Sequence, residues 1–69
     1  MVDTLALENY ITDSGKTKTY LAKKIGISLQ NLRLKMDNKY EFKSNEVAIL
    51  CDELGITRLT DKEKIFFKK

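Results

Sequence analysis

The apolar positions of the chain recur at helical spacing in several separate segments. In the first segment the residues of one helical face follow the spacing i, i+3, i+4, i+7: Leu7, Tyr10, Ile11 and Ser14. Asp3 or Thr4 offers a side-chain oxygen to the unpaired amides of the first turn. Gly15 follows and suits the left-handed conformation that ends many helices. This pattern predicts a helix over residues 3 to 14.

Two shorter helical segments come next, separated by a three-residue stretch that begins with Gly26. The first carries its apolar residues on one face: Leu21, Ala22 and Ile25. Thr17 caps its start and Gly26 ends it, which predicts a helix over residues 18 to 25. Ser28 caps a third helix, predicted over residues 29 to 37.

A polar connector over residues 38 to 43 follows, and its two aromatic residues, Tyr40 and Phe42, are expected to fold back onto the core. From Ser44 as a cap, a further apolar stripe predicts a helix over residues 45 to 54. The stripe consists of Val47, Leu50, Cys51 and Leu54.

The last segment contains a capping-box sequence, Thr60-Asp61-Lys62-Glu63, in which the threonine and glutamate side chains satisfy each other's backbone amides. It predicts a short helix over residues 61 to 67. At least one of Phe66 and Phe67 is expected to close the core.

The pattern as a whole predicts an all-α fold. No segment shows sustained alternation of apolar and polar residues with turn chemistry, as a strand would. The 69 residues suffice for one compact five-helix domain, over residues 1 to 69, which buries roughly 60% of its unfolded surface.

Positive charge is concentrated in the middle of the chain. Residues 1 to 15 carry three acidic residues and no basic one, whereas residues 16 to 43 carry eight basic residues against two acidic ones. Residues 44 to 69 are balanced. The middle segment is therefore suited to approach a polyanion. A solvated lysine-rich surface explains the same pattern, and it is the favoured interpretation for Lys23, Lys24, Lys68 and Lys69.

The two helices around Gly26 meet the requirements of a helix-turn-helix. A small residue where the helices cross, a glycine in the turn and apolar residues that lock the pair occur in the required order: Leu21, Ala22, Ile25, Gly26, Ile27 and Leu32. An ordinary αα-hairpin within a small bundle is the alternative.

These segments resemble the small Cro and CI-type helix-turn-helix regulators of temperate phages, from Leu7 through Gly55. YLAKKIGIS, from Tyr20 to Ser28, looks like the first half of that motif. LRLKMDNKYEFKSNEVAILCDELGI, from Leu32 to Ile56, looks like the recognition helix, connector and fourth helix. The connector NKYEFK and the closing EKIFFKK are similar to those of short Gram-positive phage proteins of this type. Taken as a whole, the chain most resembles the modulator-of-repression proteins, or antirepressors, of lactococcal-type temperate phages.

The resemblance implies a compact lambda-repressor-like domain and a role in the lysis-lysogeny switch. The expected partner is a CI-type phage repressor, bound through the helix-turn-helix face, with double-stranded operator DNA contacted within that complex. The alternative is an autonomous Cro-like repressor that binds operator DNA by itself. Whether the chain pairs with a second copy stays open.

Carried onto this sequence, the resemblance places partner or base contacts on one side of the third helix, which we call the interaction face: Ser28, Gln30, Asn31, Arg33, Leu34 and Lys35. Gln30 and Asn31 suit adenine and Arg33 suits guanine, whereas Lys35 suits phosphate. The expected phosphate or rim contacts are Thr17, Lys18, Lys39 and Lys43.

Leu34 is the unusual member of that face. At about 100° per residue, Leu32 and Met36 lie within about 60° of Leu29 and form a core-facing stripe, but Leu34 lies about 140° away. We therefore expect an outward leucine with a polar rim, which favours a protein partner. Contact with a thymine methyl and a lone exposed leucine without a role are the alternatives.

Several classes of function are disfavoured. The chain has no histidine, no glycine-rich phosphate loop and one cysteine, Cys51, on an apolar stripe, so we expect neither an enzyme nor a metal or cofactor site. No small-molecule substrate is expected either. Without an 18-residue apolar run or a signal-peptide pattern, we expect no membrane association and a cytoplasmic location. The resemblance to phage regulators implies that this is the cytoplasm of the bacterial host.

Overall fold

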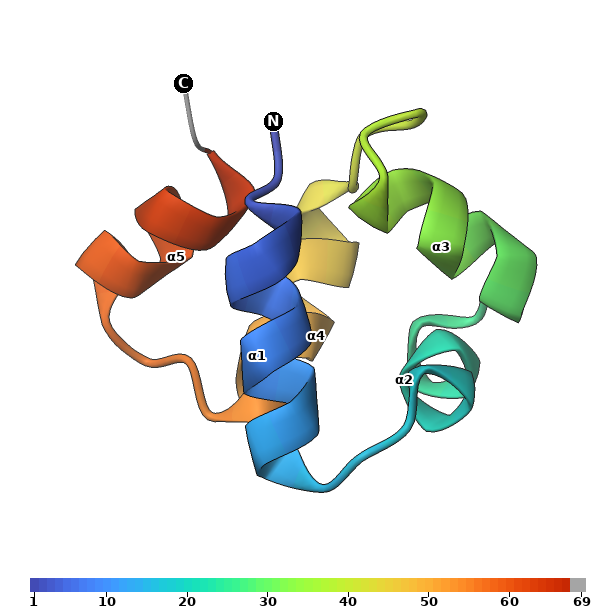
Figure 1. Cartoon of the computed structure of the whole chain (residues 1–69), viewed down its shortest axis with the longest axis horizontal. Coiled ribbons are helices and arrows are strands. Elements are labelled where there is room, and N and C mark those ends of the chain that lie inside the picture. The colour runs from blue at the N-terminus through green and yellow to red at the C-terminus, as the bar shows by residue number, and fades with distance from the viewer. Residues whose placement is uncertain (68–69) are drawn as a thin grey trace.

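The computed structural model describes residues 1 to 67, and every regular element in that range is a helix (Figure 1). The helices are α1 (Thr4–Ser14), α2 (Lys18–Ile25), α3 (Leu29–Met36), α4 (Ser44–Leu54) and α5 (Leu59–Phe66). The predicted all-α fold is confirmed, with element ends within about two residues of those expected from the sequence.

Helices α1 and α4 form the centre of the molecule (Figure 1). Helix α1 packs against both α4 and α5, and α2 packs against both α3 and α4. Helices α2 and α3 therefore lie on one side of the central pair and α5 on the other (Figure 1). The Asp3 N–H donates to the Ile65 carbonyl at 2.6 Å, which ties the start of the chain to α5.

The predicted apolar stripes converge on one core. Each helix contributes at least two buried apolar residues to this core: Leu7, Ile11, Leu21, Ala22, Leu32, Met36, Leu50, Cys51, Leu54, Ile65 and Phe66. Burying a leucine side chain contributes about 1.5–3 kcal/mol, and this set supplies the main drive for folding a chain with no disulfide. Leu29, predicted to belong to the stripe of α3, is only half-buried and lies outside this cluster.

Three predicted helix caps are confirmed by hydrogen bonds. The Asp3 side chain accepts from the Ala6 N–H at 3.2 Å. Thr17 Oγ1 accepts from the N–H of Tyr20, and Ser28 Oγ from that of the third helical residue of α3, each at 3.1 Å. Such a bond satisfies an amide that has no partner within the helix.

The two other predicted caps are wrong. Ser44 is the first residue of α4, and Lys43 is its N-cap. Helix α5 begins at Leu59, before Thr60, because the Lys62 N–H donates to the Arg58 carbonyl at 3.1 Å and completes a turn ahead of the predicted box. The backbone closes this turn without a side-chain cap.

The aromatic residues outside the helix centres divide into buried and exposed members. Phe42 packs edge-to-face on Phe66, with ring centroids 5.8 Å apart, and closes the core beneath the connector as predicted. Tyr40, predicted to do the same, is exposed, and so is Phe67. Met1, Tyr40 and Phe67 line an open groove of about 390 Å³ together with Phe42 and Phe66.

Candidate interaction face

The turn between α2 and α3 is built from backbone hydrogen bonds around a left-handed residue. Gly26 has φ 91°, a conformation that costs other residues steric strain. Its N–H and that of Ile27 both donate to the Ala22 carbonyl, at 2.9 and 3.0 Å. The chain thereby reverses directly after α2, and α3 starts at Leu29 and packs against α2. Helices α2 and α3 and the short turn between them are thus present, an arrangement common to a helix-turn-helix and to an ordinary αα-hairpin.

The far end of α3 is fixed by a second left-handed residue, which was not predicted from the sequence. Asn38 has φ 63°, and the Lys39 N–H donates to the Leu34 carbonyl at 2.9 Å, as in a Schellman motif. The Asn38 side chain accepts from the Val2 N–H at 2.7 Å and donates to the Val2 carbonyl at 3.1 Å. The start of the chain therefore holds the end of α3 in place.

The tip of the predicted interaction face is open to solvent. Ser28, Gln30, Asn31 and Arg33 are all exposed, as a contact role requires. Ser28 already accepts a hydrogen bond as the cap of α3, so one of its lone pairs is committed to the fold. The first turn of α3 presents mainly amide side chains, which pair with either protein or base edges.

Leu34 departs from the prediction. It is half-buried and does not stand out as a fully exposed leucine, although it also lies outside the core cluster. The helical wheel places its Cα correctly but ignores what flanks it, because a neighbouring side chain can cover part of an outward leucine. Leu34 therefore offers a smaller apolar contact than the sequence suggested.

Lys35 is the largest correction to the predicted face. Its ammonium group donates to both carboxylate oxygens of Glu46 on α4, at 2.5 and 2.7 Å. Only 11% of the Lys35 side chain and 5% of the Glu46 side chain are exposed. The lysine that was assigned to phosphate is therefore committed to a buried ion pair within the domain.

Glu46 has a second partner, the N–H of Lys43, which donates to Glu46 Oε1 at 2.7 Å. Burial by itself raises the pKa of the Glu46 carboxyl. The hydrogen bonds from Lys35 and Lys43 more than offset burial, so this pKa lies below its ordinary value of 4.5. The carboxylate is consequently ionised at neutral pH. Glu46 was missed because only recognition of Lys43 as the N-cap would have marked it as the capping glutamate.

The predicted rim residues differ in their availability. Lys18 pairs with Glu8 of α1 at 2.6 Å and is partly buried. Thr17 is exposed, but its hydroxyl accepts a hydrogen bond as the cap of α2. Lys39 and Lys43 are exposed and have no side-chain ion pair within residues 1 to 67. The rim therefore keeps two exposed ammonium groups and commits the third.

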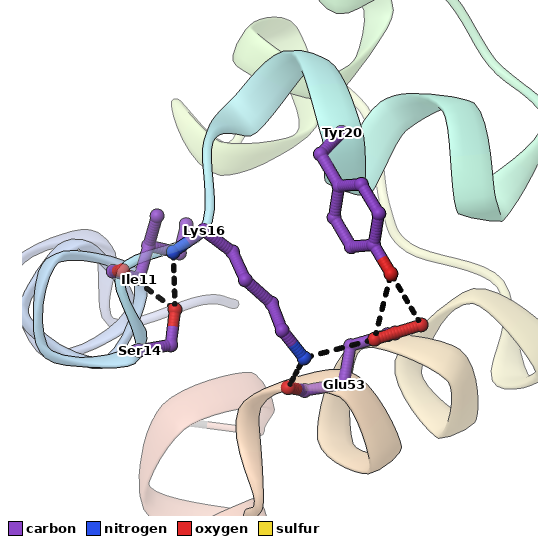
Figure 2. A network of polar contacts seen from close by, with 5 residues as sticks. All are labelled: Ile11, Ser14, Lys16, Tyr20 and Glu53. Atoms are coloured by element: carbon purple, nitrogen blue, oxygen red, sulfur yellow. Dashed lines mark hydrogen bonds and ion pairs between the residues drawn. The ribbon is translucent and has the colours of Figure 1, made fainter.

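A polar network on the opposite end of α4 holds α2 and the preceding loop (Figure 2). Lys16 Nζ donates to the Glu53 carbonyl at 2.5 Å and to its carboxylate at 2.9 Å. The Tyr20 hydroxyl lies 3.4 Å from the same carboxylate. The hydrogen bond from Lys16 lowers the pKa of Glu53 below 4.5, with Lys24 and Tyr20 adding to the effect. This network links α4 to Tyr20 of α2 and to the loop before it, and it contains no residue of the interaction face.

The remaining candidate chemistry concerns metal ligands and the single cysteine. No group of three or more histidine, cysteine, aspartate or glutamate side chains within residues 1 to 67 could hold a metal ion. Cys51 is buried, and burial raises the pKa of its thiol, so at neutral pH it is a protonated core residue. None of the helices in residues 1 to 67 is long and apolar enough to cross a membrane.

Comparison of the chain with protein-family models, with curated proteins and with solved structures gives no match. The resemblance to phage helix-turn-helix regulators therefore stays a prediction from the sequence.

Proposed function

We propose that this chain is a phage transcriptional regulator that acts as an antirepressor in the lysis-lysogeny switch. It binds a CI-type repressor in the host cytoplasm through the α2–turn–α3 unit. The tight turn between α2 and α3 and the exposed first turn of α3 support a docking role for this unit. The choice of partner rests on the resemblance of the sequence to modulator-of-repression proteins.

The commitment of cations to internal ion pairs is the observation that favours a protein partner over bare DNA. Lys18 and Lys35, two of the residues assigned to phosphate contacts, are paired with Glu8 and Glu46. Because phosphate contacts supply most of the non-specific affinity for DNA, their loss weakens an autonomous DNA binder more than a protein binder. The amides of Gln30 and Asn31 and the half-buried Leu34 suit a protein interface.

Contact with operator DNA within the complex is compatible with the same geometry. Arg33, Lys39 and Lys43 are exposed and have no ion pair within the described part of the chain. A weak cationic rim of this kind gains affinity when the repressor supplies the first attachment, because the second contact is then intramolecular.

The proposal is tested by mixing the purified chain with the CI-type repressor of the same phage and measuring association by calorimetry. Leu34→Glu places a charge at the centre of the interface and should weaken association by about 2 kcal/mol, as for a central interface residue. Leu5→Glu is the matched control, because Leu5 is an exposed leucine on α1, outside this face. It should leave association unchanged.

A second variant covers the case in which Leu34→Glu perturbs folding. Asn31→Arg changes an exposed residue of the same face and should weaken association while the helical content and melting temperature stay those of the wild type. Wild-type chain that fails to bind the repressor, or variants of both face residues that bind as well as the Leu5 control, would contradict the proposal.

A Cro-like operator repressor is the second candidate, favoured by the exposure of Gln30, Asn31 and Arg33 at the start of α3. These side chains are suited to reading adenine and guanine edges in the major groove. The test is binding of the chain alone to operator DNA and to a scrambled duplex. A Cro-like protein prefers the operator by about 1,000-fold or more, whereas the antirepressor proposal expects little preference.

A further inference from the structure

The most buried charged residue in residues 1 to 67 is Glu46, of which 4% is exposed. It lies on the first turn of α4 and receives three hydrogen bonds, two from Lys35 and one from the Lys43 backbone. No buried side-chain nitrogen or oxygen among the described residues lacks a partner. Glu46 therefore joins the end of α3, the connector and the start of α4 at one point.

Lys35 is the last residue of the predicted interaction face on α3. It follows Leu34 by one residue, a rotation of about 100° around the helix axis, so its long side chain can lean toward the outer face or toward α4. In the structure it leans toward α4 and reaches Glu46. Exposed Lys39 and Lys43 follow on the connector, and Lys35 is withdrawn from this cationic rim.

We propose that Glu46 is a specificity-determining residue, which lowers the affinity of the interaction face for nucleic-acid phosphate by holding the Lys35 ammonium group inside the domain. A phosphate that recruits Lys35 must break two charge-assisted hydrogen bonds and leave a carboxylate buried without its cation. The interaction face therefore binds non-specific DNA less tightly. Its affinity for a protein partner that needs no cation at this position is unaffected. The inference rests on the proposed function for the identity of the face.

The proposal is tested with two matched variants on a random-sequence DNA duplex. Glu46→Gln and Glu53→Gln each remove one negative charge and each release one lysine from an ion pair. Only Glu46→Gln releases a lysine of the interaction face, and the amide oxygen of the new glutamine can take the place of Glu46 Oε1 as acceptor for the Lys43 N–H. The measured quantity is the slope of log affinity against log salt concentration.

Glu46→Gln should steepen this slope by about 0.9, the value for one added phosphate contact on duplex DNA. The affinity lost between 50 and 200 mM salt then grows about threefold relative to wild type. Glu53→Gln should keep the wild-type slope, because Lys16 lies with the network at the other end of α4. Equal slopes for the two variants, including no binding by either, would overturn the proposal.

The Lys35→Gln variant provides a second test in the same salt series, in which Glu46 is kept and the lysine itself is removed. In the wild-type background it should leave the salt slope unchanged, because the structure already withholds Lys35. In the Glu46→Gln background it should remove the added 0.9. If Lys35→Gln alone reduces the wild-type slope by about 0.9, Lys35 contacts phosphate in the native protein and the proposal is wrong.

Failure of this inference and failure of the proposed function are distinguishable. The salt series contains no repressor, and the repressor-binding assay contains no DNA. A chain that does not bind the repressor but shows the steeper slope with Glu46→Gln disproves the antirepressor role alone. A chain that binds the repressor through Leu34 and shows no change of slope disproves the role of Glu46 alone.

Discussion

Helix α4 carries a lysine-glutamate pair at each end, and the two pairs have different surroundings. Glu46 in the first turn holds Lys35 of α3, and both side chains are almost fully buried. Glu53 near the last turn holds Lys16 of the loop before α2, and a third of the lysine side chain is exposed. Water competes for the second pair far more than for the first. The ion pair at Glu46 should therefore contribute more to the free energy of unfolding than the ion pair at Glu53.

The pair at Glu46 also performs a task that the pair at Glu53 does not. Helices α3 and α4 are not among the closely packed helix pairs, so Lys35 and Glu46 supply a specific polar link between them. Helices α2 and α4 pack against each other, and the Lys16 network adds to a contact that already exists (Figure 2). Loss of Glu46 should therefore affect the position of α3, whereas loss of Glu53 should affect the fold little.

The largest effect is expected for Glu46→Ala. It leaves the Lys35 ammonium without its carboxylate and the Lys43 N–H without an acceptor, and should lower the free energy of unfolding by about 3 kcal/mol. Urea denaturation followed by circular dichroism measures the change. A loss as small as that of Glu53→Ala would show that Lys35 reaches water readily and that the burial of the pair has little energetic effect.

An intermediate effect concerns the pH dependence of stability. The pKa of Glu46 in the folded chain lies below 4.5. As the pH falls through this range, Glu46 is therefore protonated more readily in the unfolded chain than in the folded chain. The contribution of Glu46 is present above about pH 4.5 and is lost as the pH decreases through the folded pKa. In Lys35→Met, burial is no longer offset by the lysine and the pKa of Glu46 should rise. The stability that the wild type loses through Glu46 at low pH should then become smaller or change sign.

Melting temperatures of the wild type and Lys35→Met between pH 3 and 7 test this point. Lys16→Met is the matched comparison: it keeps the contribution of Glu46 and loses only the contribution of the more exposed Glu53, whose pKa Lys16 lowers. Parallel curves for the wild type and Lys35→Met would contradict an ionised, lysine-paired Glu46.

The smallest effect is expected for Glu53→Ala. Solvent screens the Lys16 pair, and the 3.4 Å contact from Tyr20 is at the long end for a hydrogen bond. The variant should therefore melt at the wild-type temperature within error in a thermal scan. A clear drop in melting temperature would mean that the network in Figure 2 determines how α2 sits on α4.

The residues that the sequence placed well are those governed by local rules. The helical stripes around Leu7, Leu21 and Leu50 and the caps at Thr17 and Ser28 depend on spacing within one or two turns. Short-range geometry of this kind is present in the sequence itself. The prediction of a capping box at Thr60 was wrong because α5 begins at Leu59, ahead of the residue that was expected to cap it.

The residues that the sequence misplaced depend on partners from other elements. Lys35 meets Glu46 from a position eleven residues away, across a connector whose path no local pattern specifies. Leu34 is half-buried although its place on the wheel is outward, and Tyr40 is exposed although its neighbour Phe42 is packed. The position of the Lys35 side chain is decided by a carboxylate from another helix, which only the folded chain brings within reach.

The most direct test of the central claim is the exchange of lysine ammonium protons with water, observed by NMR for each Nζ separately. If Glu46 holds Lys35, the Lys35 ammonium signal should persist at a pH and temperature at which those of exposed Lys39 and Lys43 have vanished. In Glu46→Gln it should vanish with them. A Lys35 signal that exchanges as fast as that of Lys39 in the wild type would contradict the account.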